Sequence, residues 1–258
     1  MDWGRCMEFG RSIIDGVEIK LCSKEPHAYK HHVHKELSLG YIVEGTTDLT
    51  LHDRTIHYRD GNGVIIPPLM THKCAPNDID HWSYAMLFVD PDYFGDLVCF
   101  PRARKLTGAQ ALKLKGFIDR LMNDQYMESL ESVLIDLLLE FGETNPAEIA
   151  ADADDHSRMI HDYIIQHVND VITLDQLQEM AGQNKFTIIR NFKKAYVTTP
   201  AAYHLQNRVA EAKRMLGKGM DVFDICEALK FYDQAHFIRE FKKMYGITPG
   251  TYVAQISG

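Results

Sequence analysis

Residues 238–252 read IREFKKMYGITPGTY, and residues 189–203, which lie 49 positions earlier, read IRNFKKAYVTTPAAY. Nine of the 15 positions in the two stretches are identical. Two copies are too few for a solenoid, because stacked repeats need about three or more units to bury a continuous core. The repeat therefore indicates a duplicated module whose two copies contact adjacent parts of one target.

Helix-capping residues mark the start of each helix around both copies. Ser, Thr, Asp and Asn satisfy the unpaired backbone N–H groups at a helix N-terminus. From residue 157 onward the residues predicted in this role are Ser157, Thr173, Asn184, Thr199, Asp221, Asp233 and Thr248. Each unit is therefore predicted as a short helix, a tight turn, a second helix, and a Thr-Pro pair that begins another helix.

This arrangement is the helix-turn-helix pattern, in which the second helix enters the major groove of DNA. The turns are Gly182-Gln183 in the first unit and Lys230-Phe231-Tyr232 in the second. Helical spacing and aromatic character predict a set of core-facing side chains: Leu174, Leu177, Ile188, Phe192, Tyr196, Tyr203, Phe223, Ile225, Leu229, Phe237, Phe241, Tyr245 and Tyr252.

The opposite faces of the two second helices carry the candidate DNA contacts. The candidates for reading bases are Lys185, Phe186, Ile189, Arg190, Gln234, Ala235, Ile238 and Arg239. Arginine pairs with guanine and glutamine with adenine in the major groove. The pairs Lys193-Lys194 and Lys242-Lys243 lie one turn further on and suit phosphate, which positions a protein without reading sequence. Alternatively, Arg190 and Arg239 are structural, each paired with a carboxylate of its own module.

Residues 157–256 resemble the DNA-binding domain of the AraC/XylS family of bacterial transcription regulators. The resemblance is carried by residues 237–249, FIREFKKMYGITP, and in the first copy by Ile188, Arg190, Phe192, Lys193, Lys194, Thr199, Pro200 and Tyr203. It implies that both units lie on one face, are joined by the long helix after Thr199, and read successive major grooves. The departures from the family pattern are Lys230 and Val197, where glycine is usual, and Gln178 and Cys226, where a small residue is usual.

The charge distribution separates the chain into two parts. The net charge is -8, yet from Ser157 onward 13 Lys and Arg stand against 10 Asp and Glu. An acidic first part and a mildly basic second part predict two domains with different partners. No apolar run approaches the roughly 18 residues of a membrane span. The five scattered cysteines fit a reducing cytosol, so a cytoplasmic protein without membrane contact is expected.

The first part is predicted to be rich in short strands. Alternating apolar residues between Gly, Asp, Asn and Pro clusters predict strands at 37–43, 48–52, 55–58, 64–66 and 82–89. Strands at this spacing favour an antiparallel sandwich or small barrel, whose interior can hold one small ligand. The expected fold class is therefore α+β, with a strand-rich domain at 1–106 and an all-α domain at 157–258.

A helical segment and a linker join these two domains. Helical periodicity covers 107–141 with a break at 123–125, and the series Leu130, Leu134, Leu137, Phe141 has spacings of 4, 3 and 4. This series either packs on the strand-rich domain or forms a dimer seam, since the spacing is that of a coiled coil. Residues 142–156 contain an acidic run and little to bury, so they are predicted to be a flexible linker.

Histidines form the other chemical cluster, in HHVHKE at 31–36 and PPLMTHKC at 67–74. On a strand, His32 and His34 point to the same side. Together with His72 they have three possible roles, which are contact with a small ligand, metal ligation, or an ordinary structural role.

The N-terminal part is similar to the cupin-like effector domain that precedes many AraC-type modules. This resemblance implies that His32, His34, Glu36 and His72 contact a small-molecule effector. Metal-binding cupins also place a glutamate about four residues after the second histidine, where this sequence has Ser38 and Leu39. We therefore assign no metal and no other cofactor, and keep only His32, His34 and His72 as metal-ligand candidates.

The sequence as a whole predicts a one-component transcription regulator and not an enzyme. A small molecule binds the N-terminal domain, the helical segment forms a homodimer, and the C-terminal units bind double-stranded promoter DNA. Contact with RNA polymerase is implied by the family resemblance alone. The alternatives are a metal-dependent cupin enzyme with a helical C-terminal appendage, and a ligand-binding module whose helical half contacts protein.

Overall fold

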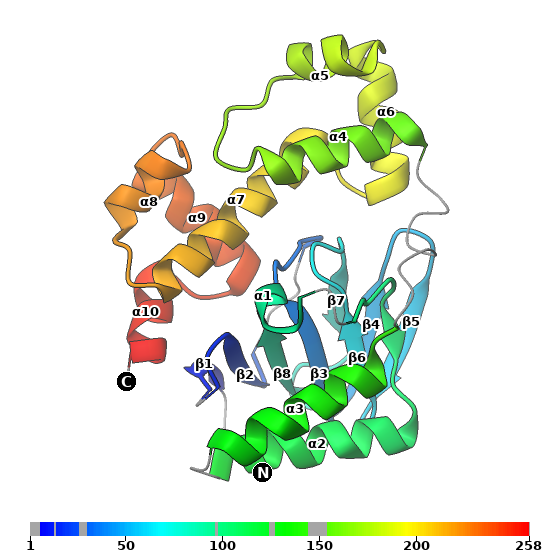
Figure 1. Cartoon of the computed structure of the whole chain (residues 1–258), viewed down its shortest axis with the longest axis vertical. Coiled ribbons are helices and arrows are strands. Elements are labelled where there is room, and N and C mark those ends of the chain that lie inside the picture. The colour runs from blue at the N-terminus through cyan, green and yellow to red at the C-terminus, as the bar shows by residue number, and fades with distance from the viewer. Residues whose placement is uncertain are drawn as a thin grey trace.

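The computed structural model describes residues 6–12, 14–25, 30–95, 98–123, 127–143 and 154–257. Strands dominate the first half of the chain, and helices make up the second half (Figure 1). Among the described residues, no helix has the length and apolar character that crossing a bilayer requires.

Two antiparallel sheets form the N-terminal half. One has the strand order β1-β2-β8-β3-β6-β9 and the other the order β5-β4-β7. The strands are β1 Cys6–Arg11, β2 Val17–Ser23, β3 Leu37–Glu44, β4 Thr46–Thr50, β5 Thr55–Arg59, β6 Gly63–Ile66, β7 Lys73–Pro76, β8 Ser83–Val89 and β9 Arg104–Lys105. The five predicted strands correspond to β3, β4, β5, β6 and β8, whereas β1, β2, β7 and β9 were not specified from the sequence.

The central strand β3 is buried on both faces. Its side chains point alternately toward the helices and toward the smaller sheet. Leu37 and Leu39 pack with the helices α2 Gly108–Asn123 and α3 Met127–Phe141, which lie side by side against the larger sheet (Figure 1). Ser38 and Ile42 face the smaller sheet and line a cavity between the two sheets. The period of two in a strand therefore separates the structural face from the ligand face.

The leucine series of α3 packs on its own sheet and does not form an exposed seam. Leu130, Leu134, Leu137 and Phe141 are all buried in the core between the helices and the larger sheet. Of the two interpretations of this series, packing on the strand-rich domain is the one that the structure supports. The exposed apolar side chains on these helices are different ones, including Leu112, Ile135 and Leu139.

The C-terminal half contains the two predicted helix-turn-helix units. Its helices are α4 Asp155–Gln166, α5 Leu174–Ala181, α6 Lys185–Tyr196, α7 Pro200–Gly217, α8 Val222–Ala228, α9 Gln234–Tyr245 and α10 Pro249–Ser257. A short helix, α1 Pro91–Phe94, belongs to the first half. The units α5–α6 and α8–α9 are joined by α7 (Figure 1).

The predicted caps are confirmed with one exception. Thr173 and Gln176 form a reciprocal capping box, and Asn184, Thr199, Asp221, Asp233 and Thr248 each accept from a backbone N–H of the first turn. The prediction that Ser157 caps α4 is wrong, because Asp154 caps that helix and accepts from the Ser157 backbone N–H at 3.1 Å. Asp and Ser cap helices about equally well, so the sequence pattern alone did not distinguish Asp154 from Ser157.

Most of the predicted linker, residues 144–153, lies outside the described residues, as does most of the predicted break at 123–125. Structured residues extend into both ends of the linker range. Cys99 and Glu143 exchange backbone hydrogen bonds at 2.9 Å, and α4 already begins at Asp155. Asn123 is the last residue of α2.

Candidate effector cavity and DNA-reading helices

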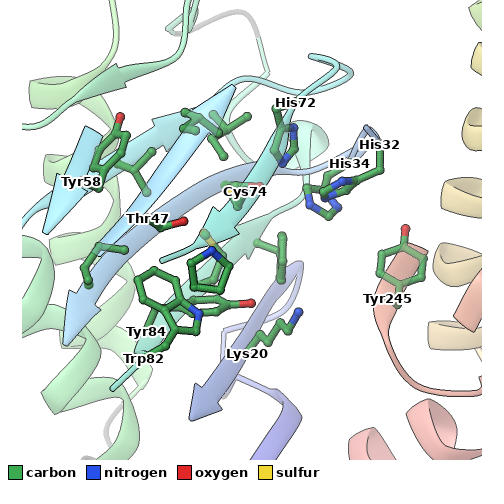
Figure 2. Close-up of a pocket in the computed structure, with 18 of the residues that line it drawn as sticks. Lys20, His32, His34, Thr47, Tyr58, His72, Cys74, Trp82, Tyr84 and Tyr245 are labelled. Atoms are coloured by element: carbon green, nitrogen blue, oxygen red, sulfur yellow. The ribbon is translucent and has the colours of Figure 1, made fainter. Parts of the chain in front are cut away.

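A cavity lies between the two sheets of the N-terminal half. Its volume is about 60 Å³. The side chains that line it come from both sheets and from α9 (Figure 2): Phe9, Lys20, His32, His34, Ser38, Ile42, Thr47, Leu49, Tyr58, Val64, Ile66, His72, Cys74, Pro76, Trp82, Tyr84, Met86, Phe88, Met244 and Tyr245. Aromatic and aliphatic walls with a few polar groups are typical of a small-molecule site.

The three predicted histidines meet at one end of this cavity. The ring centroid of His32 lies 4.8 Å from that of His34 and 4.4 Å from that of His72. All three side chains are buried. Glu36 was predicted with them but does not line the cavity, and its carboxylate accepts a hydrogen bond from Lys213 at 2.9 Å.

Several polar atoms on the cavity wall have no hydrogen-bond partner among the described residues. They are His34 Nδ1, Ser38 Oγ, Thr47 Oγ1, Tyr58 Oη and Tyr245 Oη. A buried polar group without a partner is costly, so native structures leave few of them. Their concentration on one cavity suits a polar ligand, whose groups would complete these hydrogen bonds.

Part of the wall beside the histidines comes from the C-terminal half. Met244 and Tyr245 are the last residues of α9, and the Tyr245 ring centroid lies 6.1 Å from that of His34 (Figure 2). The sequence predicted Tyr245 as a core residue, and it is buried, but against the other half of the chain as well as its own. Helical spacing alone gave no signal for this contact.

Buried ion pairs fasten the two halves together beside the cavity. Lys213 of α7 lies 2.8 Å from Glu18 of β2 and 2.9 Å from Glu36. Tyr252 of α10 donates to Glu18 at 2.6 Å. Burial alone would lower the pKa of Lys213, but Glu18 and Glu36 hold that pKa well above its usual range. These contacts were not predicted, because nothing in a single sequence links residue 213 to residues 18 and 36.

Further contacts extend this interface along α7. Tyr203 donates from its hydroxyl to the Leu69 carbonyl at 3.3 Å, and Gln206 donates to the His31 carbonyl at 2.9 Å. Lys35 forms an ion pair with Glu211. The helix that joins the two helix-turn-helix units therefore also rests on the loops that carry the histidines.

The candidate DNA contacts lie on the outer faces of α6 and α9. Most are exposed: Phe186, Arg190, Lys193, Lys194, Gln234, Ala235, Ile238, Arg239, Lys242 and Lys243. Lys185 and Ile189 are half-buried. Phe186 is 87% exposed, which is unusual for an unpartnered aromatic ring.

Ion pairing distinguishes some of these candidates from others. Lys185 pairs with Asp175 at 2.5 Å, and Lys243 pairs with Glu240 at 2.5 Å. Within the described residues, neither Arg190 nor Arg239 forms a salt bridge. The structure therefore gives no support to the alternative in which each arginine is held by a carboxylate of its own module.

The core-facing predictions for the two units are largely confirmed. Ile188, Phe192, Phe237 and Phe241 are each at most 1% exposed. The prediction for Phe223 is wrong, because its side chain is 64% exposed. Residues two apart on a helix point about 200° apart, so Phe223 cannot share the buried face of Ile225.

The two positions where the family has glycine adopt backbone angles that favour glycine. Val197 ends α6 with φ 64° and Lys230 lies in the second turn with φ 52°, both in the left-handed region. The equivalent of Val197 in the second copy is Gly246, at φ 85°. Both side chains therefore occupy backbone conformations that glycine adopts with less strain.

Two family models match separate parts of the chain. Residues 23–129 match the family model of an AraC-like ligand binding domain, and residues 177–255 match a helix-turn-helix domain model. The HTH-type transcriptional regulator YbfI of Bacillus subtilis is 25% identical over 225 residues, which cover 81% of each chain. The transcriptional activator NphR of a Rhodococcus species is 32% identical over 157 residues, which cover 57% of this chain and 46% of NphR.

The arrangement of both halves also occurs in a solved structure. Apo ToxT from Vibrio cholerae matches 95% of this chain and 100% of its own, with a TM-score of 0.63 and 11% identity, which establishes a common fold. Both relatives are named as transcription regulators. The matches favour the regulator interpretation over the enzyme alternative, and this chain belongs to the AraC family of transcriptional regulators, with an N-terminal ligand-binding domain and a C-terminal helix-turn-helix domain.

Proposed function

We propose that a small molecule bound between the two sheets controls how α6 and α9 engage promoter DNA. The observation that carries this proposal is the position of Met244 and Tyr245, which belong to the second reading helix and also line the cavity. Residues 1–106 form the effector domain in this proposal, 107–141 the dimerisation segment, 142–156 the linker and 157–258 the DNA-binding domain.

The size of the cavity supports this coupling. Sites for small organic ligands typically enclose about 300–1,000 Å³, whereas this cavity encloses about 60 Å³. An effector of more than a few heavy atoms must therefore move part of the wall. The walls from the sheets are held by ladder hydrogen bonds, so the α9 end is the wall that moves at least cost. A ligand shifts such an equilibrium by its differential affinity for the two states.

The lining residues favour an effector with polar groups on an apolar frame. Ser38, Thr47 and Tyr58 offer hydrogen-bonding atoms on the sheet walls, with His34 and Tyr245 at the α9 end. Lys20 lines the cavity as well, and burial lowers its pKa to about 8, so much of it is still charged at neutral pH. A negatively charged group on the effector suits this side chain. ToxT, of the same fold, has been solved with a bound unsaturated fatty acid.

The proposed DNA contacts are of two kinds, to base edges and to phosphates. Phe186, Ile189, Arg190, Gln234, Ala235, Ile238 and Arg239 read bases, and Lys185, Lys193, Lys194, Lys242 and Lys243 contact phosphate. Exposure of the two arginines without salt bridges supports the first role, since bidentate pairing with guanine needs a free guanidinium. His32, His34 and His72 contact the effector, whereas Glu36 supports the interface with α7.

The oligomeric state, location and output are also part of the proposal. Leu112, Ile135 and Leu139 expose 67%, 42% and 50% of their surfaces on α2 and α3, and Ile135 and Leu139 lie one turn apart. A homodimer through this surface would cover them. A DNA-binding regulator of this family acts in the cytoplasm, and contact with RNA polymerase follows from the family and from the description of NphR as an activator.

The test is selection of genomic DNA fragments by the purified protein, followed by sequencing. We expect one enriched motif with two half-contacts about one helical turn apart, because two reading helices on one face enter successive major grooves. An Arg190→Ala, Arg239→Ala double variant should lose the enrichment, whereas Lys218→Ala, on an exposed residue beyond α7, should keep it. Equal enrichment with the double variant would contradict the assigned reading faces.

A further inference from the structure

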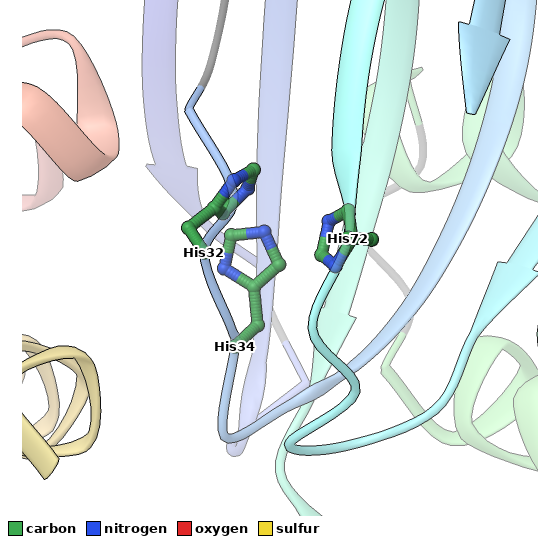
Figure 3. Close-up of side chains that lie close together, drawn as sticks. All are labelled: His32, His34 and His72. Atoms are coloured by element: carbon green, nitrogen blue, oxygen red, sulfur yellow. The ribbon is translucent and has the colours of Figure 1, made fainter. Parts of the chain in front are cut away.

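The three cavity histidines have the arrangement of an open metal site. His32 and His72 exchange two backbone hydrogen bonds at 3.0 Å, so their side chains are held as direct neighbours on adjacent segments. His34 follows two residues after His32 and reaches the same point (Figure 3). One ring nitrogen from each of the three lies within 4.8 Å of the other two. Three histidines with one position left open form a known zinc donor set.

Hydrogen bonds fix the tautomers of two of the three rings. His32 Nδ1 lies 2.7 Å from the Lys30 carbonyl, and His72 Nδ1 lies 2.9 Å from the Met70 carbonyl. A carbonyl only accepts, so both Nδ1 atoms donate, and Nε2 of each neutral ring keeps its lone pair. Metal-binding histidines almost always donate their other N–H in this way, to a carbonyl or carboxylate. Two of the three rings are therefore already oriented as ligands.

The third ring, that of His34, lacks a partner within the described residues. Its Nδ1 is buried without a hydrogen bond. Its ring centroid lies 4.8 Å from that of His32 and 5.2 Å from that of His72, so all three rings can reach one ion.

We propose that His32, His34 and His72 bind one divalent transition-metal ion, with zinc the best match to three imidazoles. Nitrogens at 2.0–2.1 Å from one zinc ion lie about 3.3 Å apart, so the rings close in slightly when the ion binds. The metal lies in the cavity assigned to the effector, but the proposal does not depend on DNA binding or on any effector.

The charges around the site explain what its fourth position accepts. No carboxylate belongs to the donor set, and Lys20 and Lys213 both contribute positive potential at His34. Lys213 is paired with Glu18 and Glu36, and Lys20 adds positive charge near His34 that opposes a dication. An anionic oxygen ligand at the open position would neutralise both, so the metal offers an anionic small molecule a direct anchor close to Tyr245.

The experiment uses the full chain, stripped of metal with a chelator and then titrated with zinc and, separately, with cobalt(II). We expect one tightly bound zinc ion per chain and, with cobalt, the intense visible absorption of a four-coordinate ion with nitrogen donors. Replacing any one histidine, as in His34→Gln, should weaken binding at least as much as loss of a supporting residue, about 10–100-fold. The matched control is His81→Gln, whose exposed side chain lies outside the cavity.

A second variant is expected to raise zinc affinity, whereas the histidine variants lower it. Lys20→Met removes the opposing charge and should tighten zinc binding, which a variant that merely failed to fold would not do. Absence of stoichiometric zinc binding by the unmodified protein would overturn the proposal. Undiminished zinc binding by a variant lacking all three histidines would overturn it as well, since the ion would then be bound adventitiously elsewhere. Neither result would bear on fragment selection by α6 and α9, so the two proposals fail independently.

Discussion

The ring of Tyr245 lies over that of His34 with their centroids 6.1 Å apart, although the two residues belong to different domains. The helix that carries Arg239 toward solvent thus ends on the wall of the ligand cavity. One rigid element of 12 residues spans both sites, and a displacement at its C-terminal end is transmitted to its reading face without an intermediate. Effector occupancy and DNA affinity are therefore expected to be coupled in both directions, as linkage requires.

Two tyrosines at this interface should respond oppositely to the loss of their hydroxyl groups. The Tyr245 hydroxyl is buried without a partner in the described structure, whereas that of Tyr252 donates to Glu18 at 2.6 Å. Tyr245→Phe should leave the free energy of unfolding unchanged or raise it by about 1 kcal/mol, because an unsatisfied group is removed. Tyr252→Phe should lower it by about 1.5–3 kcal/mol, because a hydrogen bond to a charged group is lost. Urea unfolding of the two variants checks this, and equal effects would contradict the described hydrogen bonding.

Lys213 is expected to control whether the two domains stay docked. Lys213→Met leaves Glu18 and Glu36 facing each other without their shared cation, and breaking a buried pair in this way costs about 3–5 kcal/mol. The domains can avoid most of that cost by separating, which rehydrates both carboxylates. We therefore expect a larger radius of gyration by small-angle scattering while each domain remains folded. Lys218→Met, at the exposed residue that follows the end of α7, should leave the radius of gyration unchanged.

Local signals made much of this molecule predictable from its sequence. Helix starts were found because Asn184, Asp221 and Asp233 each satisfy N–H groups two or three residues away. The cluster of His32, His34 and His72 was predicted from a His-x-His pattern and a Pro-Pro loop. The prediction that His32 and His34 lie on a strand is wrong, because residues 31–36 precede β3 and form only an isolated bridge at His32. The pairing of Glu36 with Lys213 was not predicted, since the two residues are 177 positions apart in the sequence.

The interface between the two domains was not predicted from the sequence. Tyrosines at helical spacing predict that their side chains are buried. The spacing does not show whether they pack within their own domain or against the other one. Phe9, Val33 and Phe88 of the first half pack into the same cluster as the C-terminal helices. A single sequence contains no signal for that contact, because the apolar faces of both domains look alike until they are brought together.

The repeat comparison yields a prediction about Val197. It ends α6 in the left-handed region at φ 64°, where a β-branched residue is strained, and the second copy has Gly246 at the same place. The left-handed conformation costs an L-residue roughly 1–2 kcal/mol, and the added freedom of glycine in the unfolded chain offsets part of that. Val197→Gly should therefore raise the free energy of unfolding by about 0.5–1 kcal/mol. Gly246→Val should lower it, and thermal unfolding of both variants gives the signs.

The exposed apolar surface on α2 and α3 predicts a dimer. A single charged side chain introduced into this surface should disrupt it. Leu139→Glu places a carboxylate where a second copy would cover the side chain, so dimers should dissociate into monomers under light scattering coupled to gel filtration. Val171→Glu is the control, because Val171 is 59% exposed but lies in the C-terminal half after α4. A monomeric unmodified protein would contradict the proposed surface directly.

Arg239 and Lys242 lie one turn apart on α9. Replacing each of them with alanine is expected to change DNA affinity in a different way. Arg239→Ala removes a base contact, so it should cost about 1–3 kcal/mol on the selected motif and make one position tolerant of substitution. Lys242→Ala removes a phosphate contact, so it should weaken binding to every sequence alike and reduce the slope of log affinity against log salt by about 1. Binding measured at several salt concentrations, on the selected motif and on scrambled DNA, separates the two effects. A uniform loss with Arg239→Ala would place that guanidinium on the phosphate backbone and move the reading face of α9 toward Gln234 and Ile238.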